Sequence, residues 1–330
     1  MKAADLIITQ GRIICMEGSA RRPSALAIAG NRIVAIGADD DVAGLCGPHT
    51  RMIDARGKSV IPGIIESHLH LFGGAVELDS HMINEINGFR AVSDSISHYA
   101  KSQPQGAVIV VNGAAHTSFG DRPITRQAMD EIVPDRPFIM ICFDHHTVWA
   151  NTRALESAGL MRGASLPPGN EVVLDASGLA TGELREAAAF NPVLALTPTG
   201  GREWLGMTTG ENPAPPVTPA QRATDLAFMK KGLDYAASLG ITTLHNMDGN
   251  WYQLELLDAL RHEGNLIARV EVPFHQKNYF ETVRVDEAVE MRARYNDDML
   301  WCRRVKIFMD GVLESMTALM LDDYPGAPGN

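Results

Sequence analysis

Two histidines one residue apart, His68 and His70, mark the stretch IIESHLHLFGG at residues 64–74. They follow a run of branched apolar residues that we expect to form a buried strand. Successive side chains of a strand point to opposite faces, so both imidazoles project the same way while Leu69 points to the other side. Neutral imidazoles are common zinc ligands, and the pair therefore predicts part of a metal site. The alternative is two surface histidines.

A lysine interrupts a second apolar strand, RRVKIFMDG, at residues 303–311. Lysine is almost never fully buried unless its charge is compensated, so Lys306 either reaches the rim of the strand or pairs with Asp310. A second interpretation gives Lys306 a chemical role. Burial favours the neutral amine, because it depresses the pKa of a lysine. A neutral amine reacts with carbon dioxide, and the anionic carbamate that results can bridge two metal ions.

The elements that would carry these groups differ along the chain. The first sixty residues are typical of small β structure, and the stretch ALAIAGNRIVAIG (25–37) predicts a hairpin around Gly30 and Asn31. Short strands at this spacing indicate a sandwich or a partial barrel.

The last hundred residues alternate between helix and strand. Thr218 is a plausible N-cap with Pro219 at the first helical position. Alternation with short connections is the pattern of a parallel α/β sheet or barrel. The middle of the chain, roughly 75–217, is less regular, with expected strands at 107–113 and 137–143, a short helix at 151–160 and a hairpin that runs into a helix at 171–186. The expected helices cover 218–240, 252–265 and 285–296, and the expected strands cover 241–248, 266–274 and 303–310.

Composition excludes several classes of protein. The 330 residues are 45% hydrophobic and carry a formal charge of −11, which argues against a nucleic-acid or anionic-membrane partner. No apolar run reaches the about 18 residues of a membrane span. Four scattered cysteines without a CxxC pair argue against a zinc finger or a disulfide framework. The first residues do not form a secretory signal, so we expect a cytoplasmic protein.

Several stretches together resemble the amidohydrolase superfamily, and most of all its family 3 branch of deformylase-like enzymes that act on N-substituted amides. They are VIPGIIESHLHL (60–71), DHHTVWANTRALESAGL (144–160), GITTLHNM (240–247) and VKIFMDG (305–311). Within the second stretch, His146, Trp149 and Asn151 match a His-x-x-Trp-x-Asn signature. The order of the motifs along the chain is more specific than any one of them.

The resemblance implies a fold and a set of site residues. The fold would be a metal-dependent hydrolase (β/α)8 (TIM) barrel at 60–330, with a family insert at roughly 75–217, plus a small β-sandwich domain at 1–59. His68 and His70 would be metal ligands at the end of the first barrel strand, and Lys306 the carbamylated bridge on the fourth, or on the fifth if PFIMICF (137–143) also belongs to the barrel. His146 and His245, each at the end of a strand, would contact substrate.

The implied activity is hydrolysis of an amide or another non-peptide C–N bond, with N-substituted formamides as the model substrate. The implied cofactors are one or two divalent metal ions, zinc first, and carbon dioxide for the lysine. The partner would be a small-molecule amide, and a homo-oligomer is conceivable. The family pattern has two later histidines and a catalytic aspartate beyond residue 330, so we expect half of the barrel to be missing and the chain to be poorly active. The alternatives are a non-catalytic scaffold, and a deaminase or cyclic amidohydrolase.

Overall fold

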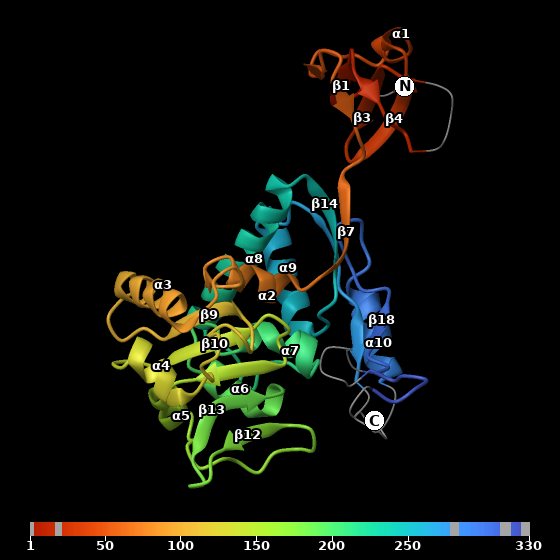
Figure 1. Cartoon of the computed structure of the whole chain (residues 1–330). Helices are drawn as coiled ribbons and strands as arrows, with labels where there is room; N and C mark the ends of the chain where they lie inside the picture. Colours follow the sequence, from red (N-terminus) through yellow and green to blue (C-terminus); the bar gives the residue numbers. More distant parts are fainter. Residues whose placement is uncertain (1–2, 17–21, 278–283, 311–317, 325–330) are drawn as a thin grey trace. The chain divides into compact units, whose positions relative to one another are not determined.

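A computed structural model describes residues 3–16, 22–277, 284–310 and 318–324. Internal contacts divide the chain into two compact units, Met1–Ile64 and Ile65–Asn330, whose elements are labelled in Figure 1. Each unit is described by itself.

The first unit is a small β domain. Its main sheet has the strand order β4-β3-β1-β5, and β2 pairs with β6 in a second, two-stranded sheet. The predicted hairpin is confirmed, because β3 and β4 pair antiparallel on either side of Gly30, whose φ of 59° suits a tight turn. The elements are β1 (Leu6–Thr9), β2 (Arg12–Ile13), β3 (Ala25–Ala29), β4 (Arg32–Gly37), α1 (Asp39–Ala43), β5 (Arg51–Asp54) and β6 (Ser59–Val60).

The second unit contains a six-stranded sheet within the stretch that the sequence pattern marks as irregular. Its order is β12-β13-β11-β10-β9-β8. Alternate residues of its central strand β10 enter two different hydrophobic clusters, so both faces of the sheet are buried. The strands are β8 (His81–Met82), β9 (Ile109–Ala114), β10 (Phe138–Cys142), β11 (Thr147–Ala150), β12 (Glu171–Leu174) and β13 (Ala180–Arg185).

Helices cover both faces of this sheet. Phe138 and Met140 pack with residues of α3 (Phe89–Ser102) and α4 (Arg126–Ile132). Ile139 and Ile141 pack with α5 (Thr152–Ser157) and α6 (Ala187–Leu194) on the opposite side. Thus the region forms a three-layer α/β/α arrangement with its own core.

A four-stranded sheet carries the histidine strand, and a separate two-stranded sheet carries the lysine strand. The four-stranded sheet has the order β17-β15-β14-β7, with β14–β15 and β15–β17 parallel, and β16 pairs with β18 in parallel in the two-stranded sheet. This chain order is the expected one, while a closed (β/α)8 barrel remains a prediction. The strands are β7 (Ile64–Leu69), β14 (Ile241–Asn246), β15 (Arg269–Glu271), β16 (Phe274–Gln276), β17 (Leu300–Trp301) and β18 (Val305–Ile307). The helices are α2 (Leu71–Glu77), α7 (Arg202–Thr208), α8 (Pro219–Ser238), α9 (Trp251–His262) and α10 (Val285–Arg294).

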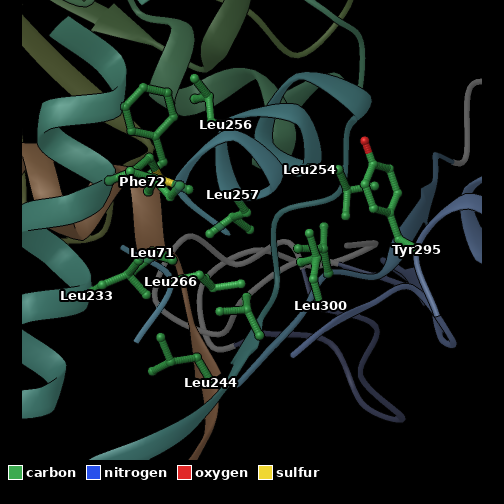
Figure 2. Close-up of a cluster of buried hydrophobic side chains, with 14 of the residues drawn as sticks. Leu71, Phe72, Leu233, Leu244, Leu254, Leu256, Leu257, Leu266, Tyr295 and Leu300 are labelled. Carbon is green, nitrogen blue, oxygen red and sulfur yellow. The ribbon is translucent and has the colours of Figure 1, made fainter. Parts of the chain in front are cut away.

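The local signals that predict α8 are confirmed. The Thr218 hydroxyl accepts a hydrogen bond from the Gln221 amide while the Gln221 side chain accepts one from the Thr218 amide, which is a capping box. The apolar face of this helix then packs, with α2 and α9, over the parallel sheet. Figure 2 shows this cluster, with Leu233 of α8, Leu257 of α9 and Leu244 of β14 among its members.

Two expectations about burial are wrong. Ile65 in β7 is 60% exposed, and Val305 in β18 is 55% exposed. The reason is the place of these strands in the sheets. β7 lies at the edge of its sheet, and β18 has a single partner strand among the described residues. The strands that carry His68 and Lys306 are therefore only partly covered.

All four cysteines are free thiols, and burial raises the pKa of Cys142 and of Cys302 to about 11. Among the described helices, none combines the length and the apolar character needed to cross a bilayer.

Candidate metal centre

His68 and His70 lie side by side at the end of β7. Their ring centroids are 5.8 Å apart and their planes are nearly perpendicular, while Leu69 between them packs against the hydrophobic core. The alternation predicted for the strand is therefore present. Burial, followed by the positive charge of Lys306 and by His70, lowers the pKa of His68, which favours the neutral form that binds metals.

Asp248 fixes the orientation of His70. Its Oδ1 lies 2.6 Å from Nδ1 of His70, and the carboxylate is fully buried. A neutral imidazole that donates through Nδ1 keeps the lone pair on Nε2, so this contact selects the tautomer in which Nε2 can bind an ion. The neighbouring Asn246 accepts a hydrogen bond from the Leu71 amide, which fastens the end of β7 to the end of β14.

Lys306 in β18 is near enough to His68 for its charge to help lower the pKa of His68. It is half-buried, and its register partner in the parallel β16–β18 pair is His275. Registered residues of neighbouring strands share a face of the sheet, so His275 and Lys306 point to one side. The ring of Phe308 lies 4.9 Å from the Lys306 Nζ. The predicted pairing of Lys306 with Asp310 is not among the contacts of the described residues.

His275 is a residue that the sequence interpretation missed. It is 2% exposed; its Nδ1 lies 3.0 Å from the Gly206 carbonyl oxygen, and its Nε2 has no partner among the described residues. Burial first, and then the charge of Lys277, lowers the pKa of His275 to about 4. The signal was available, because His275 directly follows an expected strand, as His68 does.

Lys277 is a second buried cation at this end of the sheet. It is 4% exposed and donates a hydrogen bond to the Met207 carbonyl. Burial lowers the pKa of Lys277 to about 7, against the opposing pull of Asp248. Burial thus favours the neutral form of this amine.

Imidazole nitrogens and a carbamate oxygen are donor types that bind divalent metals, and the ligand set of His68, His70 and Lys306 remains a prediction. No three histidine, cysteine or acidic side chains of the described residues are placed to hold an ion by themselves. The predicted set consists of two imidazoles and a carbamylated lysine, so it does not need three histidine, cysteine or acidic ligands. Two observations favour it, namely the Nδ1 contact that leaves Nε2 of His70 free and the unpartnered Oδ2 of buried Asp248.

A pocket of about 450 Å³ opens beside the two imidazoles. His68, His70 and Asp248 line one part of it, and apolar side chains including Trp204 and Met207 line another. His145 also lines it, whereas the sequence interpretation favoured the next residue, His146.

The two predicted substrate contacts are placed elsewhere. Nδ1 of His146 lies 2.9 Å from Oε1 of Glu186, which raises the pKa of His146. Nδ1 of His245 lies 3.7 Å from Oε2 of Glu271. Neither histidine is among the residues that line the pocket, as far as the structure describes the chain. Their role in substrate binding remains a prediction.

Comparison with known proteins decides the family. Residues 51–330 match the model of the amidohydrolase family. The chain belongs to this family, in its family 3 branch. The family inferred from the sequence motifs is thus confirmed, while the roles of His68, His70 and Lys306 remain predictions.

The individual relatives share 25–31% of the aligned residues with this chain. The chain is 31% identical over 188 residues to an N-substituted formamide deformylase of Arthrobacter pascens, which covers 56% of this chain and 35% of that protein. It is 25% identical over 336 residues to the protein LONG AFTER FAR-RED 3 of Arabidopsis thaliana, covering 99% of this chain and 54% of the other. The chain therefore spans about half or less of the length of these relatives.

The fold also has a solved counterpart. An uncharacterized metal-dependent hydrolase of Pyrococcus horikoshii OT3 superposes with a TM-score of 0.68 at 19% identity, covering 98% of this chain and 59% of that one. A likeness at this identity establishes the shared mixed α/β fold.

Proposed function

We propose that the protein is a metal-dependent hydrolase that cleaves an amide or another non-peptide C–N bond, with N-substituted formamides as its substrate class. The observation that carries the proposal is the pair His68 and His70 beside a pocket, with Nδ1 of His70 held by buried Asp248. Family membership and the named activity of the Arthrobacter pascens relative support it.

In this proposal His68, His70 and Lys306 hold the metal, which is most simply zinc because imidazole nitrogens suit it. When bound, such a cation supplies Lewis acidity toward a carbonyl oxygen and an activated water. Lys306 takes part as a carbamate. Its neutral amine forms an N–C bond to carbon dioxide and releases one proton, which leaves an anionic oxygen donor.

The residues around these ligands have defined tasks. Asp248 keeps His70 in the tautomer with a free Nε2, because its carboxylate accepts the Nδ1 proton. The apolar wall formed by Trp204 and Met207 excludes water from one side of the pocket and packs against the substituent of the amide.

The test is formate release from N-butylformamide by protein supplied with zinc and bicarbonate. We expect turnover that disappears on chelation, returns with zinc and is lost in the His68→Ala/His70→Ala double variant. The matched control is His98→Ala, which removes an exposed histidine from α3.

Turnover that survives both chelation and the loss of the two histidines would contradict the proposal. Release of ammonia from a ring-bound amino group, with no formate from any formamide, would favour a deaminase instead.

A further inference from the structure

The lining of the pocket includes acidic side chains that the metal centre does not explain. Glu77 at the end of α2, His145 after β10 and Glu203 in α7 line the pocket together with Trp204. Helices α2 and α7 contact each other, so these groups are held by packed elements of one unit. None of them belongs to the proposed ligand set.

Glu203 is the most unusual of these groups. It is 6% exposed, and its Oε2 has no hydrogen-bond partner among the described residues. The hydroxyl of Thr199 bonds to the carboxyl, but burial dominates and raises the pKa of Glu203 to about 6. A buried carboxyl with an unpaired oxygen is costly to a fold, so its position on a pocket wall indicates a group kept for a ligand.

Glu77 and His145 also line the pocket. Oε1 of Glu77 lies 3.8 Å from Nε2 of His145, and Nδ1 of His145 is buried without a partner. His145 has a left-handed backbone conformation, with a φ of 62°, which turns its ring toward Trp204 at a centroid distance of 5.1 Å. Non-glycine residues in this conformation cluster at functional sites.

The charges around the pocket select the chemistry of a ligand. The acids that line it are Glu66, Glu77, Glu203 and Asp248, and among the described lining residues there is no lysine and no arginine. A carboxylate ligand would meet like charge on this wall, whereas an ammonium or N–H group would find acceptors.

We infer that Glu203, with Glu77 and His145, forms a subsite for a positively charged or N–H-donating group, of which an alkylammonium ion is the simplest example. The carboxylate of Glu203, whose buried Oε2 has no partner among the described residues, accepts one N–H, and the Glu77–His145 pair offers further polar contacts in the same pocket. Trp204 and Met207 pack against the alkyl part. The inference rests on the proposed function in one respect only, which is that the ammonium corresponds to the amine that C–N cleavage releases.

The experiment compares two probes of equal length and opposite charge, hexylammonium and hexanoate, by titration calorimetry at constant ionic strength. We expect hexylammonium to bind at least about tenfold more tightly than hexanoate. Glu203→Gln keeps the shape of the side chain and should weaken hexylammonium binding about tenfold, because a charge-assisted hydrogen bond is lost. Glu156→Gln makes the same charge change at an exposed position of α5 and should leave binding unaltered.

Glu77→Gln, at a half-buried position, provides an independent variant and should weaken hexylammonium binding about threefold; it decides the matter if Glu203→Gln does not fold. Hexanoate binding as tightly as hexylammonium would overturn the inference. Affinity for hexylammonium that is unchanged in the folded variants would also overturn it.

The readout separates this inference from the proposed function, since it needs no turnover. Selective ammonium binding without hydrolysis of any amide would support the subsite and contradict the proposed hydrolase. Amide hydrolysis without selective ammonium binding would support the proposed hydrolase and contradict the subsite.

Discussion

The central strand of the six-stranded sheet and the strand that carries the histidines have opposite environments. All five residues of β10 are buried, whereas β7 has exposed isoleucines and an exposed His68. β10 has a neighbour on each side and helices on both faces, while β7 lies at a sheet edge. Substitutions in β10 therefore remove buried contacts on both faces of a sheet, whereas substitutions at the exposed positions of β7 remove few.

The largest effect tests this contrast directly. Phe138→Ala in β10 removes a fully buried aromatic side chain, so we expect a loss of about 3–5 kcal/mol in the free energy of unfolding. Ile65→Ala in β7 removes a side chain that is 60% exposed and should cost less than about 1 kcal/mol. Urea denaturation of both variants measures the difference. Equal losses would show that β7 is as well covered as β10.

The pattern of the sequence was informative where structure is local. The hairpin at Gly30 and the start of α8 at Thr218 follow from turn and capping residues, and both are confirmed. The alternation of β7 correctly separated Leu69 from the two histidines. These features depend on neighbours a few residues away, which the sequence displays directly.

Features that depend on distant pairs were missed. Asp248 lies 178 residues from His70 along the chain, and nothing in either local pattern indicates their contact. Several strands of the six-stranded sheet are predicted from the sequence, at 107–113, 137–143 and in the hairpin at 171–186, but their assembly into one sheet is not, because it depends on pairs of strands far apart in the chain. Burial of the lysine strand was overestimated, because apolar composition does not reveal whether a strand has neighbours on both sides.

The next effect concerns the partner of His70. Asp248→Asn removes the charged acceptor at Nδ1 and with it the preference for one tautomer, so zinc affinity should fall about 10–100-fold. Competition with a fluorescent chelator measures the affinity. Asp234→Asn, in the exposed pair with Lys230 on α8, is the control and should change nothing. An unchanged affinity in Asp248→Asn would remove Asp248 from the metal centre.

A smaller effect separates stability from ligand binding at Glu203. Its pKa is raised by burial from 4.5 to about 6, so the folded state binds more protons than the unfolded state between these values. Stability is therefore lost as the pH rises through this window, and the loss is complete above about pH 6. Glu203→Gln should recover about 2 kcal/mol of unfolding free energy at pH 8 and little at pH 4. A variant that is less stable at pH 8 would show that the carboxylate has a compensating partner.

The smallest effect concerns His146. The hydrogen bond to Glu186 raises the pKa of His146 above 6.5, so its stabilising contribution is complete below pH 6.5 and is lost as the pH rises through the folded value. The difference in melting temperature between the protein and His146→Ala should shrink between pH 6 and pH 9. His98→Ala, at an exposed position, should show no such trend. A difference that is constant with pH would contradict an ion pair with Glu186.

The account depends most on His68 and His70 as metal ligands, and the metal content of the purified chain tests this directly. Mass spectrometry of metals after dialysis against zinc, with bicarbonate present, gives the number of zinc ions bound to each chain. We predict at least one for the unaltered protein and for His98→Ala, and close to none for the His68→Ala/His70→Ala double variant. The same zinc content in all three proteins would contradict the assignment of the metal centre.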